Sequence, residues 1–345
     1  MNPDWHDFLT RHGATLADGI VQRFGDTAAE LDATAHNTVL CDLSQFGTVR
    51  VSGDESQSFL QNLLSNDIRE VSATRAQLSS FNTAKGRMLA TMLIWREGED
   101  YLLQLPRLLC EPIRKKLGMY VLRAKVKITD AGDGIISLGL SGVNAQEILR
   151  TQFGELPQQA FGVIGTTQGS MIKISGSRFQ VSTPAPDAAS LWTALGQHAQ
   201  PVGSACWDWL NIRSGIPVIL PQTQEQFVAQ MVNLELIGGV NFNKGCYPGQ
   251  EIVARMQYLG KLKRRMYLAH LDGSGTPQAG DELFSAEMEG QACGMIVNAA
   301  PAPGGGYDVL ATVQVSTRET QAVHWKSLHG GTLEFLPLPY PLPDV

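Results

Sequence analysis

The chain has 345 residues, 43% of them hydrophobic, so it can bury large cores and form two or three domains without disulfide or metal staples. Its 27 basic and 33 acidic side chains give a net charge of −6, which disfavours bulk binding to nucleic acids and acidic membrane surfaces. The first residues contain neither a basic nor an apolar run, and no stretch of about 18 uncharged apolar residues occurs, so we expect a cytoplasmic protein without a membrane anchor.

The cysteines and histidines show no grouped spacing. The five cysteines are far apart in the sequence: Cys41, Cys110, Cys206, Cys246 and Cys293. An odd number without a CxxC motif predicts free thiols rather than a disulfide framework. The seven histidines form no HExxH or HxxxH pattern, so the sequence predicts no metal held by this chain alone. Walker A, GxSxG and GxGxxG motifs are also absent, which argues against a nucleotide-binding fold.

The first third of the chain mixes helical and strand patterns. Residues 4–36 are helical in pattern and partly amphipathic, and residues 48–51 alternate like a short strand. Residues 52–55 form a capping box, and the apolar residues after it predict a helix of roughly three turns that ends at Ser65. Residues 101–116 predict a buried strand followed by a helix with a basic end.

The middle of the chain predicts strands with tight turns between residues 126 and 184, with helices at about 144–152 and 187–199. One face of a further strand is predicted from four residues at alternate positions: Trp207, Trp209, Asn211 and Arg213. Such a face could offer a stacking wall and hydrogen-bond donors to a flat heterocycle, or its tryptophans could be core residues.

After residue 261 the pattern becomes all-β. Strand-like runs occur at residues 266–271 and 309–315, and glycine-rich turns occur at residues 273–275 and 304–306. This pattern predicts a separate C-terminal domain that resembles a barrel.

The most specialised segment surrounds Cys246. Pro248 occupies a first helical position, so Cys246 lies just before a helix start. Unpaired N–H groups and the helix dipole favour a thiolate there, and Lys244 adds positive charge, so we expect a lowered thiol pKa. Gly245 and Gly249 remove side chains from both flanks, which would let a ligand or partner approach. Alternatively, Cys246 is a small buried apolar residue and the glycines simply turn the chain.

This segment resembles a known family signature. Residues 244–251, Lys-Gly-Cys-Tyr-Pro-Gly-Gln-Glu, followed by Val-Ala-Arg at 253–255, are similar to the signature of the YgfZ family, folate-binding relatives of the glycine-cleavage T-protein. Upstream, residues 41–53, 59–61 and 65–67 resemble the N-terminal pattern of T-proteins. The resemblance covers most of residues 37–270.

The resemblance implies an α+β, three-lobed aminomethyltransferase (T-protein)-like fold around a central folate channel, with a C-terminal β-barrel domain. Residues 1–45 and 131–260 would form the folate-binding α+β domain that carries the Cys246 motif. Residues 46–130 would form an interleaved α+β domain, and residues 261–345 the barrel.

The implied function is that of a tetrahydrofolate-binding protein that supports iron–sulfur cluster assembly or repair, and thereby tRNA modification, through a reactive Cys246. Tetrahydrofolate or a derivative would be the cofactor, and Cys246 could contact an iron–sulfur cluster transiently. Expected partners are folate and iron–sulfur assembly factors or cluster-containing enzymes. The net charge weighs against direct tRNA binding.

One departure separates this chain from T-proteins. Where T-proteins carry paired aspartates, this chain has Ala90 and Thr91. Aminomethyl transfer needs a carboxylate to orient and support its iminium-forming chemistry. We therefore expect that this chain is not a conventional aminomethyltransferase. Arg213 also stands where T-proteins carry a glutamate for the pterin, so either pterin recognition would differ or the folate would bind in another pose.

The predicted functional thiol is Cys246, with Lys244 beside it. The predicted folate contacts are Asn82, Lys85, Arg87, Trp207, Asn211, Arg213, Tyr247, Gln250, Glu251 and Arg255. The alternative function is a folate-dependent aminomethyl or methyl transferase or demethylase. The basic run at residues 261–265 could accept phosphates or the glutamate tail of a folate, contact RNA, or be a solvated domain junction.

Overall fold

The computed structural model describes residues 1–345 except 259, 261, 274, 289 and 344–345. The chain divides into two compact units, each built from three stretches of sequence. Unit 1 contains Met1–Phe59, Ile68–Gln77 and Leu93–Trp207. Unit 2 contains Leu60–Asp67, Leu78–Met92 and Asp208–Val345. The division into three domains that was predicted from the sequence stays a prediction.

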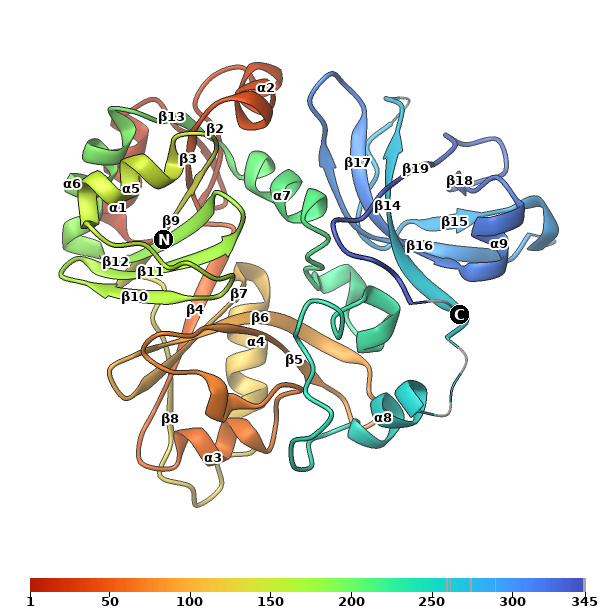
Figure 1. The fold of residues 1–345 in the computed structure, drawn as a ribbon, viewed down its shortest axis with the longest axis horizontal. Helices are drawn as coiled ribbons and strands as arrows, with labels where there is room; N and C mark the ends of the chain where they lie inside the picture. Colours follow the sequence, from red (N-terminus) through yellow and green to blue (C-terminus); the bar gives the residue numbers. More distant parts are fainter. Residues whose placement is uncertain (259, 261, 274, 289, 344–345) are drawn as a thin grey trace. The chain divides into compact units, whose positions relative to one another are not determined.

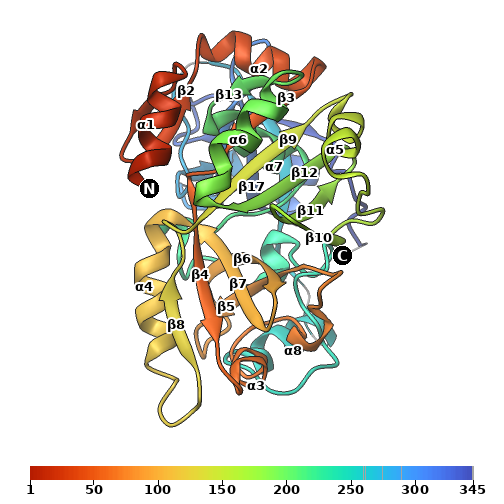
Figure 2. The same cartoon turned by 90° about the vertical axis from the view of Figure 1, so that its left-hand side faces the viewer.

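Unit 1 contains a six-stranded sheet in the order β10-β11-β12-β9-β3-β13. Its strands are β3 (Val39–Asp42), β9 (Ile135–Ser141), β10 (Val163–Thr166), β11 (Gly169–Ser175), β12 (Arg178–Pro184) and β13 (Gln200–Val202). One face is covered by α1 (Pro3–Arg11), α5 (Ala145–Phe153) and α6 (Ala185–Gly196) (Figure 2). Buried side chains from these helices and from the sheet form one core, because each helix turns an apolar stripe toward the sheet. The strands and helices predicted for this region are confirmed.

The prediction of continuous helix over residues 4–36 is wrong in its middle. Helix α1 is followed by a hairpin of β1 (Thr15–Ala17) and β2 (Ile20–Arg23), and helix α2 (Thr27–His36) comes after it. Asp18 and Gly19 form the hairpin turn with φ angles of 51° and 71°. An Asp-Gly pair readily adopts these left-handed angles, so turn chemistry overrides the helical spacing.

A second sheet has the order β5-β6-β7-β4-β8, and the boundary between the two units passes through β6. Its strands are β4 (Phe46–Ser52), β5 (Gln77–Asn82), β6 (Met88–Glu97), β7 (Asp100–Pro106) and β8 (Lys127–Asp130). Helix α4 (Arg107–Gly118) follows β7 directly, as predicted. The short strand predicted at residues 48–51 is confirmed within β4.

The helix predicted to reach Ser65 is shorter than expected. Helix α3 (Ser56–Gln61) has six residues. Leu64 instead forms a β-bridge with Phe81, and the Ser65 N–H donates to the Ser80 carbonyl at 2.9 Å. Pairing with a strand therefore takes backbone groups that a third helical turn would have used.

Unit 2 ends in a curled antiparallel sheet that forms a half-barrel, in the order β18-β15-β16-β17-β14-β19 (Figure 1). Its strands are β14 (Arg264–Leu271), β15 (Glu282–Phe284), β16 (Ala292–Pro301), β17 (Tyr307–Gln314), β18 (His324–Trp325) and β19 (Glu334–Leu336). The predicted strand-like runs lie in β14 and β17, except for Val315. Val315 begins α9 (Val315–Thr320), a short helix within the region predicted to be all-β. Of the predicted turns, Ser274 lies outside the described residues.

The strand predicted through residues 207–213 is wrong, because these residues form α7 (Ser204–Arg213). The boundary between the two units falls inside this helix, after Trp207. Residues two positions apart on a helix point in very different directions, so the four alternating side chains do not share a face. In the part of the chain that the structure describes, no helix is long and apolar enough to cross a membrane.

Candidate functional site

The Cys246 segment lies in unit 2 and leads into helix α8 (Gln250–Tyr258). The loop begins with a local turn, in which the Asn243 N–H donates to Asn241 Oδ1 at 2.8 Å. The Asn241 N–H donates in turn to the Ser65 carbonyl at 3.1 Å. The helix begins two residues after Pro248, so the predicted helix start is correct to within this margin.

Lys244 is a buried cation, with 5% of its surface exposed. Its Nζ donates to the carbonyls of Gln61 at 2.6 Å, Leu64 at 2.5 Å and Asn66 at 3.0 Å. An ammonium has three donors and no acceptor, so three carbonyls match its bonding capacity. The charge of Lys244 therefore fastens the loop to residues 60–67, a use that the sequence did not predict.

Cys246 is the exposed cysteine among five free cysteines, and the other four are buried. The alternative that Cys246 is a buried apolar residue is therefore wrong. Its neighbour Tyr247 is buried, and this burial raises the pKa of the phenol to about 12. A Cβ added to Gly245 would have no atom within 4 Å, so this flank of the thiol is open. The loop thus presents the thiol between two buried anchors, Lys244 and Tyr247.

The start of α8 packs against the turn between β5 and β6 through two glycines. Gly249 and Gly86 have φ angles of 81° and 71°. A Cβ on Gly249 would lie 2.4 Å from the Gly86 Cα, closer than real side chains approach. Backbone therefore touches backbone at this point, and only glycine fits.

Replacing Gly249 with alanine is expected to lower the free energy of unfolding by about 2 kcal/mol or more, because the Cβ meets the backbone of Gly86 and φ is left-handed. The same substitution at Gly245 is the matched control, since its Cβ would enter open space. Denaturant unfolding of both variants measures the difference. Equal stability of the two variants would contradict the proposed backbone contact.

This contact brings several predicted folate residues into one part of unit 2. Lys85 is exposed on the β5–β6 turn, and Arg87 Nη1 donates to the Gln226 carbonyl at 2.6 Å. Gln250 Nε2 donates to the Lys244 carbonyl at 3.3 Å, while Glu251 and Arg255 are exposed on α8.

Asn82, on β5, is the predicted folate residue with an unmet donor. It is 1% exposed, and its Oδ1 accepts from the Ser80 hydroxyl at 2.9 Å. Its Nδ2 is buried and has no hydrogen-bond partner among the described residues. A buried amide donor without a partner is costly, which marks Asn82 as a binding candidate.

Trp207, predicted as part of a stacking surface for a flat heterocycle, is not accessible to a ligand. Trp207 belongs to unit 1 and is 3% exposed. The guanidinium of Arg178 lies 3.9 Å from the centre of its ring and donates to the Trp207 carbonyl at 3.5 Å. Arg178 is distant in sequence and no local motif announces it. Trp207 is thus a core residue stacked by an arginine, not an open platform.

A buried carboxylate that the sequence did not predict accepts hydrogen bonds from α7 residues in unit 2. Asp308, on β17, is buried, and its Oδ2 accepts from Trp209 Nε1 at 2.8 Å and from Arg213 Nη1 at 3.5 Å. Its Oδ1 lies 2.9 Å from His270 Nδ1. Arg213 thus meets a carboxylate, while Asn211 is buried on the same helix. The sequence offered no signal for Asp308 or His270.

The positions that replace the T-protein aspartates lie inside β6, where Ala90 and Thr91 are both buried. The Thr91 hydroxyl donates to the Pro217 carbonyl at 3.2 Å and accepts from the Ile219 N–H at 3.1 Å. Neither side chain supplies an anion, and the hydroxyl is engaged by neighbouring backbone.

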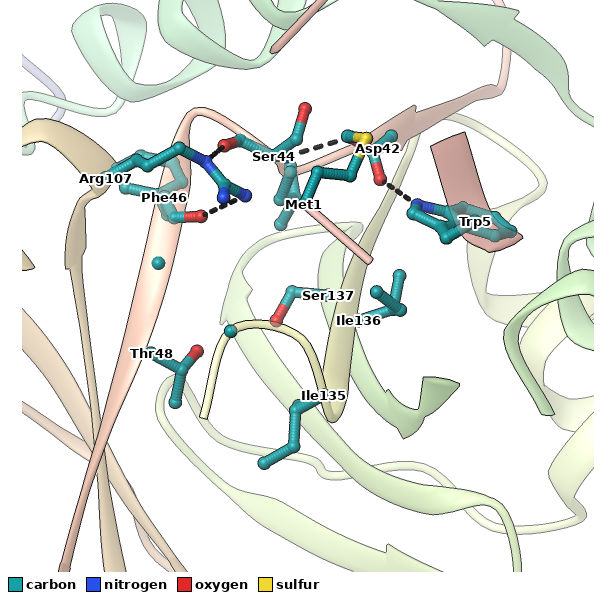
Figure 3. A pocket seen from close by; sticks show the side chains of 13 residues that line it. Met1, Trp5, Asp42, Ser44, Phe46, Thr48, Arg107, Ile135, Ile136 and Ser137 are labelled. Carbon is teal, nitrogen blue, oxygen red and sulfur yellow. Dashed lines mark hydrogen bonds between the residues drawn. The ribbon is translucent and has the colours of Figure 1, made fainter. Parts of the chain in front are cut away.

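The Asp42 segment lines a small cavity of about 20 Å³ in unit 1, which has room for about one water molecule (Figure 3). Asp42 Oδ2 accepts from Trp5 Nε1 at 2.7 Å, and Oδ1 accepts from the Ser44 N–H at 3.0 Å. Burial raises the pKa of Asp42, while hydrogen bonds from Ser44 and Trp5 and the charge of Arg107 oppose the shift. Arg107 Nε donates to the Ser44 carbonyl at 2.5 Å. These contacts give the segment a structural role.

The alternative uses predicted for the basic run at residues 261–265 stay predictions. The basic run begins at Lys261, which lies outside the described residues, and its last two members open strand β14. No group of three or more potential metal-ligating side chains occurs among the residues that the structure describes.

Comparisons with known proteins give a matching domain family and named relatives. The model of the GCVT N-terminal domain matches residues 21–237. A protein of Shigella boydii serotype 4 (strain Sb227), named tRNA-modifying protein YgfZ, is 30% identical over 307 residues, which cover 88% of this chain and 94% of that protein. The protein of the same name from Klebsiella pneumoniae (strain 342) is 30% identical over 308 residues, which cover 89% and 94%.

The glycine cleavage system aminomethyltransferase T from Bartonella henselae has the same fold. Its crystal structure matches with a TM-score of 0.81 at 17% identity, over 98% of this chain and 97% of that one. The predicted α+β, T-protein-like fold class is therefore confirmed. The GCVT N-terminal domain match and the 30% identity to these relatives over 88–89% of the chain show that this chain belongs to the YgfZ family.

Proposed function

We propose that this protein binds a tetrahydrofolate and supports iron–sulfur cluster assembly or repair in the cytoplasm, and thereby tRNA modification, through the thiol of Cys246. The observation that carries the proposal is the exposed thiol of Cys246, held between buried Lys244 and Tyr247 in a segment that resembles the YgfZ signature. The relatives at 30% identity are named tRNA-modifying proteins, which supports the link to tRNA modification.

The chemistry of Cys246 suits a transient soft ligand. Thiolates bind iron and exchange readily with other thiols. An iron–sulfur cluster needs several protein ligands, and the other four cysteines of this chain are buried. Cys246 would therefore supply one sulfur while a partner protein supplies the others.

Residues of unit 2 fit a folate. The Asn82 amide would donate from Nδ2 to an acceptor on the pterin, which would satisfy a group that is otherwise unmet. The exposed cations Lys85 and Arg255 would attract the carboxylates of the glutamate tail. A bound tetrahydrofolate supplies one-carbon chemistry. Trp207 contributes no stacking face to this proposal, because Arg178 covers its ring.

The folate part is tested by calorimetry with tetrahydrofolate. Replacing Asn82 with leucine is expected to weaken binding by about tenfold or more, because a buried donor to the ligand is lost. The control is Asn243→Leu, since Asn243 is exposed. Undiminished affinity in the Asn82 variant would remove this residue from the site, and absence of binding by the unmodified protein would overturn the folate proposal.

The thiol part is tested in cells. A Cys246→Ser strain is expected to lose activity of cluster-dependent tRNA-methylthiolating enzymes under oxidative stress. A Cys206→Ala strain is the control, because Cys206 is buried. Full activity in the Cys246→Ser strain would refute a role for the thiol.

The second candidate is a folate-dependent aminomethyl or methyl transferase or demethylase, and the fold shared with aminomethyltransferase T favours it. Ala90 and Thr91 provide no carboxylate where T-proteins have aspartates, which weighs against aminomethyl transfer. Formation of methylene-tetrahydrofolate by the purified protein would reverse this preference.

A further inference from the structure

Unit 1 carries a segment whose charge is opposite to that of the whole protein. Residues 112–129, here called the basic segment, span the second half of α4, the following loop and most of β8. They contain six cations and no acidic residue, although the chain has a net charge of −6. The cations are Arg114, Lys115, Lys116, Arg123, Lys125 and Lys127.

Only part of this positive charge is neutralised by neighbours. Glu111 pairs with Arg114 at 2.7 Å and with Lys115 at 3.1 Å. On the other side, Asp54 pairs with Lys125 at 3.6 Å, and Glu55 Oε2 accepts a hydrogen bond from the Lys125 backbone N–H at 2.6 Å. Asp130, the residue directly after the segment, acts on Arg114 through its charge. Among the described residues no ion pair forms at the other three cations: Lys116, Arg123 and Lys127. These three are the charges that remain available to a polyanion.

Large apolar side chains stand among these cations. Met119 is 67% exposed, Tyr120 is 43% exposed and Leu122 is 89% exposed. Leu122 also has a φ angle of 46°, in the left-handed region where a leucine costs about 1–2 kcal/mol. A strained backbone that holds a leucine out into solvent is better explained by a partner that covers it than by folding alone.

We propose that the basic segment binds a structured RNA of tRNA size. Phosphates would lie against Lys116, Arg123 and Lys127, and unpaired bases would stack on or be wedged apart by the side chains of Tyr120 and Leu122. Cations interleaved with exposed aromatic and aliphatic side chains match the two chemistries of a single-stranded RNA loop. The choice of RNA over other polyanions rests on the proposed function, in which tRNA modification is the supported process.

The charge test uses fluorescence anisotropy with labelled, unmodified tRNA over a range of salt concentrations. The triple variant K116E/R123E/K127E is expected to bind tRNA at least about tenfold more weakly. The slope of log affinity against log salt concentration is expected to become shallower by about two to three, because three phosphate contacts are lost. The matched control is R11E/R23E/R150E, which makes the same charge change elsewhere on unit 1 and should retain most of the affinity. Equal loss in both triple variants would overturn the proposal, as would no tRNA binding by the unmodified protein at low salt.

The apolar test uses Leu122→Gly. Glycine accepts the left-handed backbone, so this variant is expected to be at least as stable as the unmodified protein, while binding tRNA several-fold more weakly. Unchanged tRNA affinity would refute a contact at Leu122. If vesicles of phosphatidylserine and phosphatidylcholine bind instead of tRNA with the same dependence on these residues, the partner is a membrane and the RNA proposal fails. Tetrahydrofolate calorimetry on the same variants should be unchanged, which separates this outcome from a failure of the proposed function.

Discussion

Replacing Lys244 with methionine is expected to lower the free energy of unfolding by about 3 kcal/mol or more, because three carbonyls lose a charged donor in a buried setting. Methionine keeps most of the length of the apolar stem, so the change isolates the loss of the ammonium. Arginine should not restore stability, since its planar guanidinium cannot point three donors at carbonyls arranged around a single nitrogen. Denaturant unfolding followed by tryptophan fluorescence measures the effect.

Lys85→Met is the matched control for Lys244→Met. Lys85 is an exposed lysine in the same unit, and no hydrogen bond or ion pair of its side chain occurs among the described residues. Its replacement should change stability by no more than about 0.5 kcal/mol. If the Lys244 variant and this control unfold at the same denaturant concentration, the three carbonyl contacts do not hold the loop.

A single thiol of the native protein is expected to react rapidly with an aromatic disulfide reagent, and Cys246→Ser is expected to abolish this fast phase. Cys246 is exposed, whereas Cys41, Cys206 and Cys293 are at most 1% exposed and Cys110 is 7% exposed. Burial raises the pKa of Cys110 to about 12 and that of Cys293 to about 11. Because the thiolate is the nucleophile, these buried thiols should react at least roughly a hundredfold more slowly.

The thiol count under denaturing conditions provides the internal control. All five cysteines should react in denaturant in the unmodified protein, and four in Cys246→Ser. The variant should unfold at the same denaturant concentration as the unmodified protein, since an exposed thiol contributes little to packing. A second fast thiol, or a fast phase that survives the substitution, would show that the exposed site has been assigned to the wrong residue.

The parts of the fold that were predicted correctly are those with strong local signals. The strand at residues 101–105 and the helix after it are continuous apolar and amphipathic runs, and both occur as β7 and α4. Strands β11 and β12 form an antiparallel hairpin around the turn predicted at residues 175–177. Predictions of elements were wrong where the local signal was ambiguous. The alternation of residue types at 207–213 suits a strand, yet these residues form α7.

The candidate site was predicted in part. The special character of residues 244–251 was visible, because a cysteine between glycines before a helix start is locally unusual. The use of Lys244 was not visible, since its carbonyl partners lie up to 183 residues away in sequence. Gly249 was expected to give access to a ligand, whereas the structure uses it for contact with Gly86.

The sequence by itself determined the single-cysteine segment, the family resemblance that implied the fold class, and the cysteine pattern that predicts free thiols, because these depend on composition and short motifs. Only the tertiary structure decided which thiol is exposed, that Lys244 binds carbonyls, that Arg178 covers Trp207 and that Asp308 gathers Trp209 and His270. Burial and long-range hydrogen bonds join residues far apart in the chain, and such pairings leave no trace in the pattern of neighbouring residues.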